Sequence, residues 1–298
     1  MRLFALKIGA GVPMQSFTGA VRSVFVNAAI LTVADSLVTL VPAATGGLPG
    51  AITLDVPLGF NFASFLAVGS AGAARAGILR FAGTAGSVDL RPARPWRSRL
   101  CDISLDLGSP ARESAWQTVA VILRADGRCN AIIRLAREAI FQLAEATRQF
   151  DLARAGEAAA RLVGLGAGGT PAGDDVLVGY LAGLWSSIAG TGPRANFAAG
   201  LGEVLLGLAN RTNDVSRVYI EAAAAGEVSE RLAAVATCIA AGATPTAIAG
   251  AALAAIEIGH SSGADGMLGF LLGLAAWGPE PIFAQSRRLI DESFRRPE

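Results

Sequence analysis

Hydrophobic and polar positions follow two different periods along the chain. In the first 105 residues, short runs of β-branched and aliphatic residues are separated by Gly, Pro, Ser and Asn at intervals of about 8–12 residues. The clearest runs are 24–26, 37–41, 52–54, 78–81 and 88–90. Short strands at such regular intervals are typical of a small β-barrel or β-sandwich.

Near residue 107 the period changes to 3.6 residues, which predicts amphipathic or fully apolar helices. The predicted helices span 112–125, 129–149, 151–163, 174–189, 195–210, 213–225, 228–241, 245–257, 264–276 and 284–295. No strand alternates with these helices, which argues against a Rossmann or TIM-barrel architecture. We therefore predict an α+β protein with a β-rich domain at 1–107 and an α-helical domain at 108–298.

The composition requires a choice between a membrane protein and a soluble one. Hydrophobic residues make up 52% of the chain, charged residues make up 16%, and the mean hydropathy is +0.48. The stretch 232–256 carries no charge, but Gly242 and Pro245 divide it into halves too short to cross about 30 Å of hydrocarbon. Two buried helices joined by a turn are predicted instead, with no membrane partner.

Charge and cysteine content bear on partners and location. The 25 basic and 24 acidic residues give a net charge of +1, which argues against nucleic acid or an anionic membrane as the main partner. Lys7 lies where a signal peptide would be apolar, so we expect a cytoplasmic protein. Cys101, Cys129 and Cys238 lack metal-ligand spacing and are expected to be small buried hydrophobic residues. The arginines at 91, 94, 97 and 99 either face an anionic ligand or lie on a solvated edge strand.

Isolated charges in the apolar helical region mark an internal repeat. Asp174 and Asp175 are the only charged residues between positions 161 and 194, and Asp265 is the only one between positions 257 and 280. Segment 173–184 matches segment 263–274 at an offset of 90 residues. The shared pattern is Gly-x-Asp-x-apolar-x-Gly-aromatic-Leu-x-Gly-Leu. The second domain is thus predicted to contain a pseudo-repeated, Gly-rich helix start.

Glycines within the two repeated helices predict that the helices touch. One helix carries Gly179 and Gly183, and the other carries Gly269 and Gly273. A glycine inside a helix costs about 1 kcal/mol relative to alanine, and close approach of two helices compensates for that cost. We expect a pseudo-symmetric pair with converging N-termini.

The polar, Gly-rich loops before the helices, 166–172 and 259–262, predict a site for an anion. A helix N-terminus presents unpaired N–H groups and about half a positive charge. The ordinary alternative is that the aspartates occupy a favourable first helical turn and that Ser262 or Gly263 is a simple cap.

The carboxylates suggest two kinds of chemistry. Asp174, Asp175 and Asp265 would hold Mg²⁺ together with substrate oxygens, or they would orient a substrate amide or amine. His260, the only histidine, is a candidate proton shuttle, and these four residues are the catalytic candidates. The candidate ligand-binding residues are Gly168, Gly169, Thr170, Gly173, Arg211, Thr212, Ser261, Ser262 and Gly263. Arg211 is included because a guanidinium group binds phosphate or carboxylate through two hydrogen bonds, although the segment after it also reads as a capped helix start.

Segments 164–175 and 259–265 resemble the AllH/YlbF-like family, long known as a domain of unknown function. The likeness extends to the turn at 46–52 and to Arg94-Pro95-Trp96, which closes the family's β region. Gly169 replaces a usual leucine and Ala172 a usual serine, and the first turn lacks its usual asparagine.

The resemblance implies a subunit of oxamate carbamoyltransferase, a multi-subunit enzyme of allantoin breakdown. This enzyme interconverts oxalurate plus phosphate with oxamate plus carbamoyl phosphate. The implied partners are a small anionic substrate and other subunits of the complex, in a homo- or hetero-oligomer. Two alternatives remain open: a non-catalytic scaffold or effector-binding subunit whose glycines serve only helix packing, and a metal-dependent hydrolase.

Overall fold

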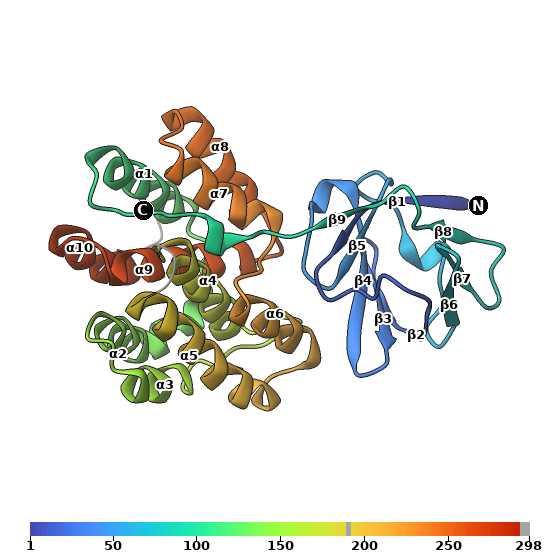
Figure 1. The fold of residues 1–298 in the computed structure, drawn as a ribbon, viewed down its shortest axis with the longest axis horizontal. Helices are drawn as coiled ribbons and strands as arrows, with labels where there is room; N and C mark the ends of the chain where they lie inside the picture. Colours follow the sequence, from blue (N-terminus) through green and yellow to red (C-terminus); the bar gives the residue numbers. More distant parts are fainter. Residues whose placement is uncertain (189–191, 293–298) are drawn as a thin grey trace. The chain divides into compact units, whose positions relative to one another are not determined.

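The computed structural model describes residues 1–188 and 192–292, and it divides the chain into two compact units, Met1–Arg97 and Ser98–Glu298 (Figure 1). Strands make up the first unit and helices the second, so the predicted α+β class is confirmed. The predicted domain bounds, 1–107 and 108–298, stay predictions. The predicted helix ends at 189 and 295 lie outside the described residues.

The first unit is an eight-stranded closed β-barrel with one additional strand. The strands are β1 (Arg2–Gly9), β2 (Phe17–Val24), β3 (Ala29–Val33), β4 (Ser36–Pro42), β5 (Ala51–Leu54), β6 (Ala71–Arg75), β7 (Ile78–Phe81), β8 (Ser87–Asp89) and β9 (Arg94–Trp96). Their order is β5-β4-β3-β2-β6-β7-β8-β1-β9, and pairing of β5 with β1 closes the barrel. The pairs β1–β8, β1–β9 and β4–β5 are parallel, and the other pairs are antiparallel. Short 3₁₀ helices, η1 (Ala43–Thr45) and η2 (Phe62–Ser64), lie in the connections.

Alternation of side chains along the strands fills the barrel. Leu3 and Ala5 of β1 are buried, whereas Phe4 and Leu6 between and after them are exposed. A barrel of eight strands is narrow enough for such inward side chains to fill its interior. The predicted strand at 24–26 is displaced, because β2 ends at Val24 and the next two residues are more than half exposed.

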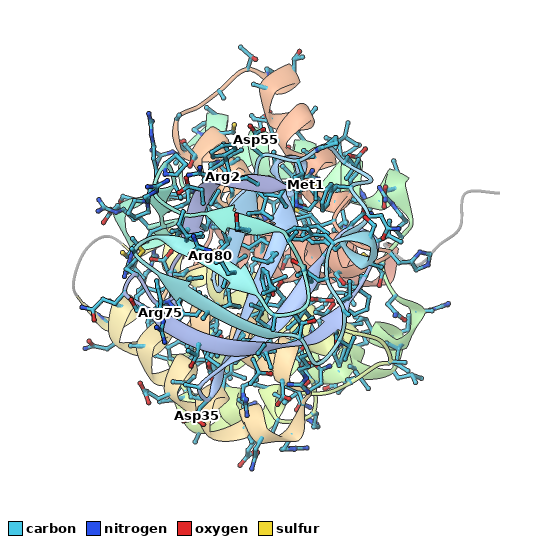
Figure 2. All side chains as sticks on the ribbon, turned by 90° about the vertical axis from the view of Figure 1, so that its right-hand side faces the viewer. Met1, Arg2, Asp35, Asp55, Arg75 and Arg80 are labelled. Carbon is cyan, nitrogen blue, oxygen red and sulfur yellow. The ribbon has the colours of Figure 1, made fainter. Side chains whose placement is uncertain are left out.

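Asp89 is the buried acidic residue of the barrel, and two arginines donate hydrogen bonds to its carboxylate. Arg91 Nε and Nη2 donate to the two Asp89 carboxylate oxygens at 2.9 and 2.8 Å, and Arg2 donates to the same carboxylate. Arg91 therefore has an internal partner, and Arg94 begins the exposed edge strand β9. Figure 2 shows Arg2, Arg75 and Arg80 on the outer surface of the barrel.

The described part of the second unit contains ten α-helices. They are α1 (Pro110–Asp126), α2 (Arg137–Arg148), α3 (Leu152–Ala159), α4 (Ala172–Ser186), α5 (Pro193–Leu208), α6 (Asp214–Ala224), α7 (Glu230–Ala240), α8 (Pro245–Ile256), α9 (Ser262–Ala276) and α10 (Glu280–Glu292). The 3₁₀ helices are η3 (Leu100–Asp102), η4 (Ala131–Ala136) and η5 (Ala209–Arg211). The predicted helix 129–149 is divided into η4 and α2.

The apolar stretch 232–256 forms two helices, as predicted. Gly242, with φ of 61°, lies in the turn after α7, and the Thr244 side chain accepts a hydrogen bond from the N–H of Ala247 to begin α8. Throughout the described residues, no helix combines the length and apolar character needed to span a membrane. Of the cysteines, Cys129 is buried as expected, but Cys101 is exposed, so the expectation of burial was wrong for it.

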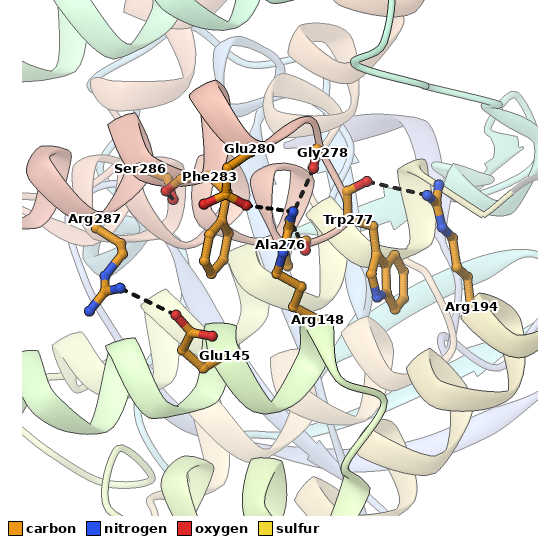
Figure 3. Close-up of polar contacts among 10 residues, drawn as sticks. All are labelled: Glu145, Arg148, Arg194, Ala276, Trp277, Gly278, Glu280, Phe283, Ser286 and Arg287. Carbon is orange, nitrogen blue, oxygen red and sulfur yellow. Dashed lines mark hydrogen bonds and ion pairs between the residues drawn. The ribbon is translucent and has the colours of Figure 1, made fainter.

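Helices α4 and α9 form the centre of the helical unit (Figure 1). Both are buried along most of their length. At the C-terminal end of α9, Arg148 donates to the carbonyl oxygens of Ala276 and Gly278 at 3.4 and 3.0 Å, and Arg194 donates to that of Trp277 at 3.2 Å (Figure 3). These cations meet the negative end of the helix dipole and satisfy its last carbonyl groups.

Candidate functional site

The sequence repeat is also a structural repeat. Helix α4 begins at residue 172 and ends at 186, while α9 begins at 262 and ends at 276, so both bounds keep the 90-residue offset. A Cβ atom added to Gly179 would lie 1.8 Å from the Gly266 oxygen, and one added to Gly269 would lie 2.0 Å from the Val176 oxygen. The two contacts are equivalent, because Gly179 corresponds to Gly269 and Val176 corresponds to Gly266 at the 90-residue offset. The helices thus form the pseudo-symmetric pair that the glycines predicted.

The two helices run parallel, so their N-termini lie at the same end of the pair. A second reciprocal contact, one turn farther on, brings Gly183 close to the Phe270 oxygen and Gly273 close to the Tyr180 oxygen. At the N-terminal end, the hydroxyl oxygens of Thr170 and Ser262 are 2.7 Å apart. Two polar loops separated by 92 residues in sequence therefore meet beside the first turns of α4 and α9.

Asp174 connects the start of α4 to two other segments. Its carboxylate accepts a hydrogen bond from the Gly164 N–H at 2.7 Å and another from the Thr212 hydroxyl. The side chain is buried, and both carboxylate oxygens have protein partners. Asp174 therefore has a clear structural role, since it holds the loop before α4 and the segment before α6 in place.

Asp175, the next residue, is in a different situation. Burial raises the pKa of its carboxyl group to about 7, although hydrogen bonds from Ser262 and Thr170 lower it, and the negative charge of Asp265 adds to the rise. Its Oδ2 atom is buried, and none of the residues in 1–188 and 192–292 forms a hydrogen bond to it. Near neutral pH this carboxyl group exists in both protonation states, so it can either donate or accept a hydrogen bond.

Asp265 is the symmetry counterpart of Asp175 and shares its main property. Its Oδ1 atom accepts a hydrogen bond from the Asn130 N–H at 2.8 Å, while Oδ2 is buried and has no hydrogen-bond partner in the described part of the chain. The residue is 0% exposed. Burial raises its pKa to about 6, and hydrogen bonds from Asn130 and Ser261 oppose that rise. The site thus contains two carboxyl groups with near-neutral pKa values and one unsatisfied oxygen each.

Neither repeated helix has an ordinary side-chain cap. The N-cap residues are Pro171 for α4 and Ser261 for α9, and neither side chain accepts a hydrogen bond from its helix. The aspartates direct at least part of their hydrogen bonding to other segments, as Gly164 and Asn130 show. The three aspartates do lie in the first turns of α4 and α9, as the ordinary alternative expected, but that position alone does not explain the bonds to Gly164 and Asn130.

The candidate glycines fall into two groups. A Cβ at Gly173 would lie 2.1 Å from the Leu162 oxygen, and one at Gly263 would lie 2.3 Å from the Ala255 oxygen. The N–H groups of these two glycines donate to Leu165 and Ile258 carbonyl oxygens. Gly168 and Gly169 instead lie in an exposed loop with open space around them. The first pair serves close packing, and the second pair leaves backbone accessible beside the site.

Two other candidates are exposed on the surface. His260 lies in the turn before α9, and Arg211 lies at the end of η5; both are exposed. The neighbouring Thr212 is tied to Asp174. Asp175 remains the candidate most closely connected with both loops.

A metal site formed by Asp174, Asp175 and Asp265 does not fit this geometry. The Asp174 oxygens are occupied by Gly164 and Thr212. Within 1–188 and 192–292, no group of three His, Cys, Asp or Glu side chains is arranged to hold a metal ion.

Sequence reasoning missed residues that contact the carboxyl groups from other helices. Asn130, just before η4, supplies an N–H to Asp265. Tyr219 of α6 lies close enough to Asp175 for the carboxylate charge to raise the pKa of its phenol, in addition to the larger effect of burial. Both residues lie in ordinary amphipathic sequence, and only the packing of the helices brings them here.

A comparison with protein families gives a match in the region that holds the two repeated helices. A family model described as oxamate carbamoyltransferase subunit AllH matches residues 162–274. Over these residues the chain is similar to the AllH family, as the two Gly/Asp motifs predicted. The AllH match begins in the loop before α4 and ends within α9, so it contains both halves of the repeat. Comparisons with curated proteins and with solved structures give no match.

Proposed function

We propose that this protein is a subunit of a cytoplasmic carbamoyltransferase of the oxamate and carbamoyl phosphate type. Its site would bind a small anionic ligand that carries an amide, between the N-termini of α4 and α9. The observation that carries the proposal is the pair Asp175 and Asp265, each with a buried oxygen that lacks a partner. Such groups are costly to bury, and a ligand that hydrogen-bonds to them would recover that cost.

The pKa values suit an amide-bearing ligand. A carboxyl group with a pKa of about 7 or 6 is present at neutral pH in both forms. The ionised form accepts a hydrogen bond from an amide N–H, and the protonated form donates one to a carbonyl oxygen. A carbamoyl group presents both functions on adjacent atoms. Asp175 and Asp265 together are thus suited to orient it.

The reaction of this enzyme class requires one proton to move. An oxygen of hydrogen phosphate attacks the carbamoyl carbon of oxalurate, the bond from that carbon to the oxamate nitrogen breaks, and carbamoyl phosphate and oxamate form. The proton lost by hydrogen phosphate must reach the departing nitrogen. A carboxyl group titrating near pH 7 suits this transfer, because general acid–base catalysis is most effective when the pKa lies near the working pH. We assign this role to Asp175.

The remaining candidates have supporting roles in the proposal. Thr170 and Ser262 hold Asp175, while the exposed backbone at Gly168 and Gly169 receives the anionic end of the ligand near the positive helix ends. Asp174 positions the loop. His260 and Arg211, which are exposed, would act only after ligand or partner subunits cover them.

Ligand binding by the purified chain tests this proposal without requiring partner subunits. Thermal unfolding is measured with carbamoyl phosphate, oxamate, oxalurate or phosphate added separately. A ligand that binds the native state raises the melting temperature. We expect the amide-bearing anions to raise it in the unmodified protein and to fail in Asp175→Asn and Asp265→Asn.

The matched control is Glu203→Gln, which removes an exposed carboxylate from α5 of the same unit. It should respond to ligands like the unmodified protein. If both aspartate variants keep the full ligand response, the carboxyl pair has no role in binding. A scaffold subunit would then be favoured, with glycines that serve helix packing alone.

A further inference from the structure

Helix α6 packs against α4, whose first turn carries Asp174 and Asp175. Thr212, two residues before the helix, donates its hydroxyl hydrogen to Asp174 in the first turns of α4. Ser216 and Tyr219 follow at spacings of four and three residues, which place them on the same face of α6 as Ile220. Ile220 and Ser216 are buried, so this face of α6 packs against its neighbouring helices, which are α4 and α5.

Ser216 has a buried hydroxyl that makes no hydrogen bond to any residue the structure describes. The residue is 1% exposed. Serine in a helix commonly bonds to a carbonyl oxygen of the preceding turn, as Ser186 does with Ala182. A buried hydroxyl without a hydrogen bond destabilises the folded protein unless a ligand or another group forms that bond.

Tyr219 lies one turn farther along the same face. Its phenol is near enough to Asp175 to respond to the carboxylate charge. Burial, together with that charge, raises the phenol pKa, so the group stays a neutral hydrogen-bond donor. Thr212 thus contacts Asp174 and Tyr219 lies near Asp175, while Ser216 lies between them in sequence at helical spacing.

We propose that Ser216 and Tyr219 are ligand-contacting residues that form the α6 side of this site. They would donate hydrogen bonds to a carbonyl or carboxylate oxygen of the small amide-bearing anion, while Asp175 accepts its amide hydrogen. This inference rests on the proposed function, because it concerns the same ligand. It adds the residues that would distinguish an amide-bearing anion from plain phosphate.

The two tyrosines of the chain allow a direct test. Tyr180 is buried, and its hydroxyl donates a hydrogen bond to Thr147 Oγ1 at 2.7 Å. Its hydroxyl is therefore already hydrogen-bonded within the protein. In protein labelled with ¹³Cζ-tyrosine, the two signals are assigned by the Tyr219→Phe and Tyr180→Phe variants. We expect oxamate and carbamoyl phosphate to shift the Tyr219 signal and leave the Tyr180 signal in place.

Affinity measurements separate this inference from the proposed function. Tyr219→Phe and Ser216→Ala should each weaken binding of oxamate about fivefold, the effect of one neutral hydrogen bond, while Tyr180→Phe leaves it unchanged. Ser216→Ala should also raise the melting temperature of the free protein, because it removes an unsatisfied hydroxyl. If oxamate binds, depends on Asp175, and leaves the Tyr219 signal and both affinities unchanged, the α6 assignment is wrong and the proposed function stands. If none of the anions binds the unmodified protein, both proposals fail.

Discussion

Gly179 of α4 lies directly against the backbone of Gly266 in α9, since a Cβ atom at Gly179 would be 1.8 Å from the Gly266 carbonyl oxygen. No side chain intervenes between the two helices at this point. The reciprocal contact of Gly269 with Val176 repeats the arrangement across the pseudo-twofold axis. The close approach is what brings the two Gly-rich loops together.

Replacement of Gly179 by alanine should therefore separate the helices and destabilise the protein. The obstacle is backbone on the partner helix, which cannot rotate away, so we expect a loss of about 3 kcal/mol or more in the free energy of unfolding. Urea denaturation followed by circular dichroism measures this loss. Ligand binding should also weaken, because the loops would move apart.

Gly250 provides the matched control. It lies within α8, is exposed, and has no atom within 4 Å of an added Cβ. Alanine has the higher helix propensity, so Gly250→Ala should stabilise the protein by up to about 1 kcal/mol. Similar effects of the two substitutions would show that the tight contact between α4 and α9 does not exist in solution.

This contact also shows how far the sequence determined the site. The 90-residue repeat and its glycines predicted a close helix pair, because a helical glycine is costly unless something approaches it. The repeat also aligned Asp175, and not Asp174, with Asp265, but it could not show which carboxyl group the rest of the protein satisfies. Gly164 and Thr212 donate hydrogen bonds to both carboxylate oxygens of Asp174, whereas Asp175 keeps one oxygen without such a bond. Tyr219 and Asn130 were not predicted because helix packing, and not local spacing, brings them to the carboxyl groups.

Asp174 should behave as a structural residue. Asp174→Ala would leave the Gly164 N–H without its acceptor and would free the Thr212 hydroxyl, so we expect a loss of about 2–4 kcal/mol in the free energy of unfolding. Denaturant titration measures it. Asp102→Ala, which removes an exposed carboxylate near the start of the same unit, should change stability by less than about 0.5 kcal/mol. Equal stabilities of the two variants would contradict the structural role.

Asp265 should make stability fall as the pH rises. Its folded-state pKa of about 6 lies above the ordinary value of 3.8, so the folded protein binds more protons than the unfolded chain between these values. The unfolding free energy contributed by this group is therefore full below pH 3.8 and declines as the pH rises through about 6. Asp265→Asn removes the titrating charge, and the new amide oxygen can still accept from the Asn130 N–H.

We expect Asp265→Asn to be more stable than the unmodified protein at about pH 8, by roughly 2 kcal/mol, and nearly equal to it at about pH 4. Unfolding measured at both pH values gives the difference. A variant that gains stability while losing ligand binding would identify Asp265 as a residue kept for function at the expense of stability. A lower stability at the higher pH would instead mean that the ionised carboxylate is well satisfied in the folded protein.

Asp89 in the barrel should show the opposite pH dependence. Hydrogen bonds from Arg91 hold its pKa well below the ordinary value, and Arg2 contributes in the same direction against the effect of burial. The stability contributed by such a group is present above the unfolded-state pKa of 3.8 and is lost as the pH falls toward the lower folded-state pKa. Asp89→Asn should thus lower the melting temperature at neutral pH, with a difference that shrinks below about pH 4.

Hydrogen exchange would locate the effect of Asp89→Asn. Amides of β1 and β8 should exchange faster in the variant at neutral pH, because Asp89 lies in β8 and its partner Arg2 lies in β1. Asp35→Asn, an exposed change in the turn between β3 and β4, is the matched control and should leave these amides unchanged. A destabilisation by Asp89→Asn that stays constant from neutral pH down to about pH 3 would refute the charge-pairing explanation, because at that pH the unfolded-state carboxyl group is already protonated.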